Sequence, residues 1–515
     1  MSLVLAETMA MKGLILSSLK RKDEAKELIR TGLRSDLRSH ICWHVYGLFH
    51  RSIGEYAEAV KAYSQALRID PENMQILRDQ GHLQMQIRDI KGFSETQRRL
   101  LSLKGSNKLA WVGFAVGHHV AGNTGLAVEV LSQYEATLDA AAAGQNEKKI
   151  ATYDQNELTL YKSRILEEDG QYEKALEELT KNRHKILDHP TSEERQAALL
   201  LKLGKFEESK RLWRRLLKDI NPENYNYHRG LQACVLCKPE YAPILRRNEV
   251  DNAQGVAGTL GNSIYNAHSA AKGSHAARGC VLPVSKESLS DDQIEEFLAL
   301  YKELHEEDPR CKAVKRIPLT FLPASHAEFE SRLENYLNAG IQKGVYSLAQ
   351  DIKSLYTDKQ KVKVLESILL DKYLAKAKAA FDAIKKHGRT KVSDSSLDDY
   401  EPCTCLWSFY MAANHYRHLE NFEKALEMID TAIEHTPTTV ELYMTKARIL
   451  KKLDRIQDAA SLLLDATKMD LADRYINTKC VKYLFRAGRQ KEANENASLF
   501  ARVSLVHRTS VLLNI

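Results

Sequence analysis

Apolar residues recur at helical spacing in the segment that begins at His40. Because residues three and four positions apart share one face of a helix, the segment predicts two amphipathic helices with a turn between them. Small residues at Gly47 and Ala59 let two antiparallel helices pack closely, and Pro71 ends the second helix. The residues that form this pattern are Trp43, Tyr46, Gly47, His50, Gly54, Tyr56, Ala59, Tyr63, Ala66 and Pro71.

The pattern recurs with a 34-residue spacing, which is typical of tetratricopeptide units. Three consecutive units begin at Leu406, Val440 and Arg474. Weaker copies occur at Gly13, Leu16, Ala25 and Ile29, at Trp111, Ala115, Ala127 and Leu131, at Leu166, Gly170, Tyr172 and Ala175, and at Gly204, Phe206, Trp213 and Leu216. Units of this kind bury a continuous core by stacking on their neighbours. We therefore predict an all-α protein, a right-handed α-solenoid of tetratricopeptide-type helical hairpins.

Breaks in the pattern divide the chain. We predict N-terminal tetratricopeptide-type repeats in residues 1–237 and C-terminal tetratricopeptide repeats in residues 403–500. The Gly-, Ala-, Ser- and Asn-rich residues 238–283 predict a disordered insertion, because they cannot bury enough apolar surface to fold. The remaining parts are an irregular helical middle region at 284–390, an acidic linker at 391–402 and a divergent tail at 501–515.

The composition is typical of a helical protein and indicates its cellular compartment. Charged residues make up 28% of the 515 residues, with only 24 glycines and 11 prolines. The net charge of +7 is small beside 75 basic and 68 acidic residues, so anion binding depends on local clusters. Eight scattered cysteines fit a reducing compartment. No signal peptide or bilayer-spanning stretch is found, so we expect a cytoplasmic protein without membrane contact.

The sequence shows no motif for catalysis or metal binding. Neither a P-loop nor another glycine-rich turn that could hold a phosphate or pyrophosphate group occurs. Cys234 and Cys237 have metal-ligand spacing, but no second ligand pair follows, which favours two ordinary thiols. His118 and His119 are adjacent on a predicted helix and cannot share a face. We therefore expect no catalytic residue, no metal and no cofactor of the chain's own.

One basic helix is a candidate for contact with RNA phosphates, which would be salt-sensitive and independent of sequence. Its residues are Lys210, Arg211, Arg214, Arg215 and Lys218. The alternative is a solvated helix face, because runs of charge usually face water.

A second basic cluster lies on the predicted groove of the C-terminal repeats. The register of the three units places Arg417, Arg448, Lys451, Tyr475 and Lys482 on the inner face, with Lys479 beside them. Cations that converge in one concavity repel each other unless an anion is present. The cluster therefore predicts an anion site, and an acidic partner helix or solvated lysines are the alternatives.

Five stretches resemble the auxiliary subunit of the N-terminal acetyltransferase A (NatA) complex. They are CWHVYGLFHRSIGEYAEAVKAYSQALRIDPEN (42–73), WVGFAVGHHVAGNTGLAVEVLSQYE (111–135), KRIPLTFL (315–322), HTPTTVELYMTKARILKKL (435–453) and MDLADRYINTKCVKYLFRAG (469–488). The resemblance implies a non-enzymatic, ribosome-associated scaffold that holds a small catalytic subunit for co-translational acetylation of Ser, Ala and similar N-termini. It also implies that inositol hexakisphosphate bridges the two subunits at the second basic cluster, and that the RNA at the first basic helix is ribosomal RNA.

The alternative function is a generic tetratricopeptide adaptor that binds a peptide tail of a chaperone or other partner. The segments ADRYINTKC and KRIPLTFL favour the NatA resemblance, because the repeat fold does not require them. The chain starts inside the first repeat pair and ends at VSLVHRTSVLLNI, where family members continue, so we expect a truncated or splice form.

Overall fold

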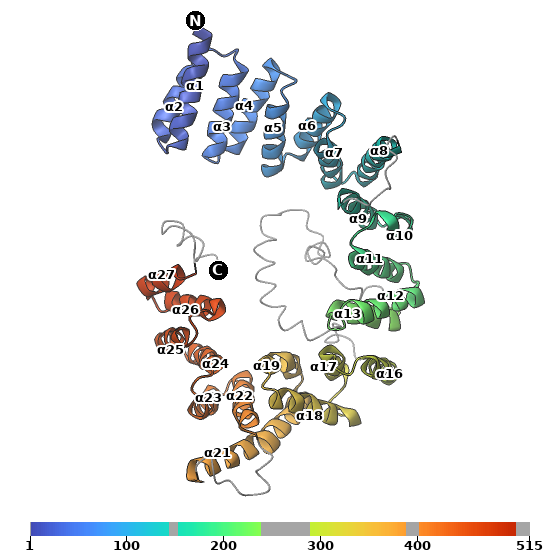
Figure 1. Ribbon diagram of the computed structural model, residues 1–515, viewed down its shortest axis with the longest axis vertical. Coiled ribbons are helices and arrows are strands. Elements are labelled where there is room, and N and C mark those ends of the chain that lie inside the picture. Colours follow the sequence, from blue (N-terminus) through green and yellow to red (C-terminus); the bar gives the residue numbers. More distant parts are fainter. Residues whose placement is uncertain (1, 144–152, 238–288, 388–400, 501–515) are drawn as a thin grey trace. The chain divides into compact units, whose positions relative to one another are not determined.

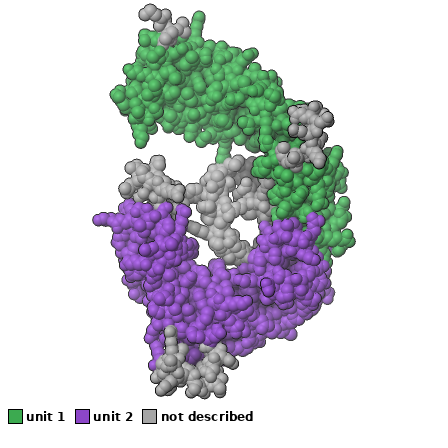
Figure 2. Space-filling model, viewed as in Figure 1, with its two compact units in different colours: residues 1–212 green, residues 213–515 purple. Residues whose placement is uncertain are grey.

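The computed structural model describes residues 2–143, 153–237, 289–387 and 401–500. These residues form helices and turns, with no strand among them, which confirms the predicted all-α class. They fall into two compact units, residues 1–212 and 213–515 (Figure 2). The predicted insertion at 238–283, residues 391–400 of the predicted linker and the predicted tail at 501–515 lie outside the described residues.

The first unit is a stack of helical hairpins in which each helix packs mainly on its neighbours in sequence (Figure 1). Its elements are α1 (Ser2–Ser18), α2 (Lys22–Ser35), α3 (His40–Ser52), α4 (Tyr56–Ile69), α5 (Met74–Gln86), α6 (Ile90–Leu103), α7 (Lys108–Val120), α8 (Thr124–Ala143), α9 (Tyr153–Glu168), α10 (Tyr172–Lys181), the 3-10 turn η1 (Arg183–Lys185), α11 (His189–Lys202) and α12 (Phe206–Asp219), which extends into the second unit.

The second unit begins with less regular helices and ends with three regular hairpins. Its elements are α13 (Tyr225–Val235), α16 (Asp291–Glu307), α17 (Lys312–Phe321), α18 (Ala327–Gln342), α19 (Leu348–Asp351), the 3-10 segment η3 (Ile352–Thr357), α20 (Lys359–Glu366), the π-helical segment η4 (Ser367–Leu374), α21 (Ala375–His387), α22 (Pro402–His418), α23 (Phe422–His435), α24 (Val440–Lys452), α25 (Ile456–Met469), α26 (Arg474–Arg486) and α27 (Gln490–Ser498).

The turn inside each regular hairpin has the same backbone conformation. One residue there has a positive φ, as Gly54 does at 86°, a conformation that glycine adopts without steric cost. Three runs of such residues are each spaced by 34 positions: Lys20, Gly54, Arg88 and Gly122, then Gly170 and Gly204, then Glu420, Asp454 and Gly488. The spacing confirms the predicted repeat and adds the hairpin of α5 and α6, which the apolar pattern did not single out.

The two helices of the first predicted hairpin pack as closely as its small residues require. A Cβ atom on Gly47 of α3 would lie 2.2 Å from Cε1 of Tyr63 on α4, and the Tyr63 side chain is fully buried. Ala59 is also fully buried, at the start of α4. The structure confirms that Gly47 and Ala59 lie at the crossing and that Tyr63 fills the space between the helices.

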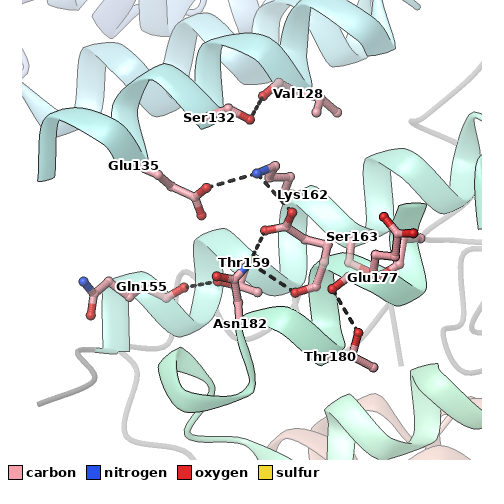
Figure 3. A network of polar contacts seen from close by, with 12 residues as sticks. Val128, Ser132, Glu135, Gln155, Thr159, Lys162, Ser163, Glu177, Thr180 and Asn182 are labelled. Atoms are coloured by element: carbon pink, nitrogen blue, oxygen red, sulfur yellow. Dashed lines mark hydrogen bonds and ion pairs between the residues drawn. The ribbon is translucent and has the colours of Figure 1, made fainter. Parts of the chain in front are cut away.

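The first unit buries an ion-paired lysine between three consecutive helices (Figure 3). Nζ of Lys162 on α9 lies 3.0 Å from Oε2 of Glu135 on α8 and 3.1 Å from Oε2 of Glu178 on α10. Burial opposes the charge, but the two carboxylates outweigh it and raise the pKa of Lys162. The contact therefore joins neighbouring hairpins by charge as well as by apolar packing.

Candidate functional site

Four of the six residues in the predicted anion site line one pocket of about 370 Å³ in the C-terminal hairpins, here named the α24–α26 pocket. Arg448 and Lys451 come from α24, and Lys479 and Lys482 come from α26. A fifth cation, Arg486, lines the same pocket and was missed by the sequence analysis. The first helices of two adjacent repeats thus present five cationic side chains to one cavity.

The pocket is built on the apolar core that holds these hairpins together. Met444, Leu463 and Tyr483 line it and are buried in a core cluster shared by α24, α25 and α26. Small residues such as Ala447 and Ala459 in that cluster allow the helices to pack closely. None of the described residues that line the pocket carries a carboxylate, so its lining does not balance its charge.

The cations in the α24–α26 pocket act on one another. Burial lowers the pKa of Lys451, and the positive charges of Arg486, Lys452 and Lys479 lower it further. Such mutual repulsion disfavours the protonated side chains, whereas a bound anion would favour them. The electrostatics of the pocket therefore match an anionic ligand.

Arg448 also has a structural contact that lies outside the repeats. Its Nη2 donates a hydrogen bond of 3.1 Å to the hydroxyl of Tyr346, which lies between α18 and α19. Burial opposes the charge of the guanidinium, but Tyr346 and neighbouring phenols raise the pKa of Arg448 overall. Tyr346 therefore fixes the position of one of the five cations.

The other two residues of the predicted anion site, Arg417 and Tyr475, lie beside the pocket and do not line it. Nη2 of Arg417 donates to Oδ1 of Asn414 at 2.9 Å, and the ring of Tyr475 lies below Nζ of Lys479, 5.1 Å from its centroid. Burial and the charge of Arg448 lower the pKa of Arg417. Both residues therefore adjoin the cations that line the cavity.

The predicted ribosome-contact residues lie on one side of α12. They are Lys210, Arg211, Arg214, Arg215 and Lys218. The opposite side buries Trp213. Arg214 is held by two carboxylates of α16, since its Nη2 lies 2.5 Å from Glu303 and 3.5 Å from Glu307. The exposed cations of this helix are Arg211, Arg215 and Lys218. Glu207, Glu208 and Asp219 on the same helix are also exposed.

The histidine and cysteine pairs singled out in the sequence have other surroundings. Nδ1 of His119 contacts the hydroxyl of Tyr161, and its Nε2 contacts Glu168, each at 2.8 Å. Cys234 is buried and Cys237 is exposed, and both are free thiols. Across the described ranges, no three His, Cys, Asp or Glu side chains form a metal-binding group. A search of the same ranges found no helix with the length and apolarity needed to cross a bilayer.

Known proteins similar to this chain share both its repeats and its less regular middle region. Residues 153–512 match the family described as N-terminal acetyltransferase A, auxiliary subunit, and residues 4–217 match the family described as Psidin, N-terminal TPR repeats region. The similarity therefore extends well beyond the regular repeats.

Two relatives and one solved structure illustrate the similarity. The chain is 40% identical over 498 residues to the N-terminal acetyltransferase A complex auxiliary subunit NAA15 of Arabidopsis thaliana, covering 96% of this chain and 48% of that protein. It is 32% identical over 496 residues to human N-alpha-acetyltransferase 16, NatA auxiliary subunit, covering 96% of this chain and 49% of that protein. The chain thus spans about half the length of these relatives. A chain in the solved structure of Naa15/Naa10 bound to HypK-THB superposes with a TM-score of 0.73 at 29% identity, covering 98% of this chain and 64% of that chain.

Proposed function

Because the chain belongs to the family of N-terminal acetyltransferase A auxiliary subunits, we propose that it is a non-catalytic scaffold for the catalytic subunit of a NatA complex. The observation that carries this proposal is the family match over residues 153–512, which includes the non-repetitive middle region as well as repeats. The solved relative, which is in a complex with Naa10, supports such a catalytic partner. A generic tetratricopeptide adaptor would not require similarity in the middle region.

We propose that the α24–α26 pocket binds inositol hexakisphosphate where the chain meets the catalytic subunit. Five cationic side chains and a lining without carboxylates suit a compact polyphosphate. Phosphate oxygens form strong charge-assisted hydrogen bonds with lysine and arginine. In this proposal the ligand neutralises the repulsion that lowers the pKa of Lys451 and gives both subunits a shared anion to contact.

Calorimetric titration of the full chain with inositol hexakisphosphate tests this site. The substitution Lys451→Glu should weaken binding strongly, because it removes a donor and places a negative charge beside the phosphates. Lys451 is preferable to Arg448, whose reversal would also break the contact with Tyr346. The matched control is Arg215→Glu on α12, away from the pocket lining, which should leave binding unchanged.

Thermal unfolding gives an independent measure of the same site. Ligand that binds only the folded chain should stabilise it by about 2.7 kcal/mol at one hundred times the dissociation constant. Absence of binding, or equal binding by all three proteins, would remove the polyphosphate site. The scaffold proposal would remain, because it rests on the family match.

We further propose that the exposed side of α12 contacts ribosomal RNA phosphates, which would place the complex in the cytoplasm at the ribosome. Arg211, Arg215 and Lys218 are exposed cations of this helix, and Arg214 forms ion pairs with α16. The triple substitution of these three residues by glutamate should abolish salt-sensitive co-sedimentation with ribosomes. The substitution Lys479→Glu is the control, and equal co-sedimentation of both variants would exclude this surface.

A further inference from the structure

A second pocket lies among the less regular helices, within the second unit and outside the α24–α26 pocket. It has a volume of about 410 Å³, and its lining comes from α16, α17, α18, α19 and the turns between them. We name it the α16–α19 pocket. The sequence analysis did not find it, because these helices lack the 34-residue register.

The rim of this pocket is strongly basic. Six lysine and arginine side chains line it: Lys302, Arg310, Lys312, Lys315, Arg332 and Lys343. Lys302 and Arg332 share one carboxylate, since both bind Glu328, at 3.1 and 2.7 Å. That carboxylate balances one of their two positive charges. Within the described parts of the chain, the other four form no ion pair, and all four are exposed.

The negative charge in the pocket lining already has partners within the chain. Asp351 is the one carboxylate among the described residues that line the pocket. Its Oδ1 lies 3.5 Å from Nη1 of Arg316, and its Oδ2 accepts a hydrogen bond of 3.3 Å from the hydroxyl of Tyr336. Asp351 therefore cannot balance four further cations, and the rim carries an excess of positive charge.

The lining of the α16–α19 pocket also contains apolar side chains. Val314 and Leu348 are buried side chains of the lining, and Val345 beside them is partly buried. A hydrated polyphosphate would gain nothing from such a surface, whereas a hydrophobic side chain would be stabilised by leaving water.

We propose that the α16–α19 pocket binds an acidic peptide segment that carries one large apolar side chain. The apolar side chain packs on Val314, Val345 and Leu348. Flanking carboxylates pair with the cations of the rim, namely Arg310, Lys312, Lys315 and Lys343. This site is separate from the polyphosphate site and does not depend on it.

Fluorescence anisotropy of the full chain with a labelled acidic pentapeptide tests the proposal. The probe has a central phenylalanine flanked by two Asp or Glu residues on each side, and its comparator has serine at the centre. Burial of the phenylalanine ring predicts at least about tenfold tighter binding of the phenylalanine peptide. Binding should also weaken as salt is added, because exposed charges are screened.

The double substitution Lys315→Glu and Lys343→Glu should weaken binding of the phenylalanine peptide by at least about tenfold, because the carboxylates of the peptide would then be repelled instead of attracted. Both side chains are exposed, and circular dichroism should show unchanged helicity. Lys479→Glu in the other pocket is the matched control and should bind the peptide as the unmodified chain does. No binding by the unmodified chain, equal binding by the double variant, or equal affinity for the serine peptide would each overturn the proposal.

Discussion

The substitution Gly47→Ala tests the close helix crossing that defines the repeat register. The added methyl group would lie 2.2 Å from Cε1 and 2.5 Å from Cδ1 of Tyr63. Carbon atoms in ordinary contact are about 3.5 to 4.0 Å apart, so the overlap is large. The Tyr63 ring is fully buried and has no space into which it can rotate without displacing other core atoms.

Two effects of opposite sign determine the size of the change. Alanine is favoured over glycine inside a helix by about 1 kcal/mol. Overpacking a core typically costs about 1 to 3 kcal/mol, and the depth of this overlap places it at the upper end. We therefore expect a net destabilisation of the hairpin formed by α3 and α4 of about 2 kcal/mol.

Native-state hydrogen exchange followed by mass spectrometry is the suitable assay, because hairpins in a repeat array can open locally. Peptides from α3 and α4 should exchange about thirtyfold faster, while peptides from the C-terminal hairpins should be unchanged. The matched control is Gly125→Ala at the start of α8, where a Cβ would meet nothing within 4 Å. The control substitution should slow hydrogen exchange in α8 slightly or leave it unchanged.

A double-mutant cycle gives the sharper test of the mechanism. If the overlap causes the loss, Tyr63→Leu should partly relieve it, and the two substitutions should couple by at least about 1 kcal/mol. Unchanged exchange in α3 and α4, or equal effects at positions 47 and 125, would refute the assigned crossing.

Three further substitutions test other contacts. Lys162→Ala should destabilise α8 to α10 by about 3 to 5 kcal/mol in local hydrogen exchange, because Glu135 and Glu178 would stay buried without their cation; a loss below 1 kcal/mol would be inconsistent with this pairing. Burial lowers the pKa of His228 from 6.5 to about 4, so the unfolded chain binds a proton that the folded chain does not, and stability should fall as pH drops between these values. His228→Phe should flatten that slope in denaturant titrations at several pH values, and an unchanged slope would exclude His228 as its source. Tyr346→Phe should destabilise the C-terminal hairpins by about 1.5 to 3 kcal/mol in thermal unfolding, because it removes a hydrogen-bond partner of a charged guanidinium; an unchanged melting temperature would count against that contact.

The repeat was predictable wherever the core of a hairpin is apolar. Gly47, Ala59 and Tyr63 form a pattern because each must lie on the buried face of its helix. The hairpin of α5 and α6 escaped notice because its core contains hydrogen-bonded polar residues. There Oγ1 of Thr96 donates to Oε1 of Gln84 at 2.8 Å, and both residues are buried. Apolar periodicity cannot detect such a core.

The candidate site was predictable as far as the register extends. The repeat register predicted that Arg448, Lys451 and Lys482 lie on one inner face, and all three line the α24–α26 pocket. Arg486 lies at the last position of α26, just beyond the positions considered. The contact between Arg448 and Tyr346 spans 102 residues, which no local pattern indicates. The α16–α19 pocket was missed for the same reason, since its lining comes from several elements without a common period.

The central claim is that this chain holds and tunes a catalytic acetyltransferase subunit. The most direct measurement is the initial rate of acetyl transfer to a Ser-starting peptide by a fixed amount of purified catalytic subunit, as the full chain is added. A scaffold predicts that the rate rises and reaches a plateau at one chain per catalytic subunit, while the chain alone transfers no acetyl group. A rate that does not change at any concentration of the chain, or transfer by the chain alone, would contradict the claim.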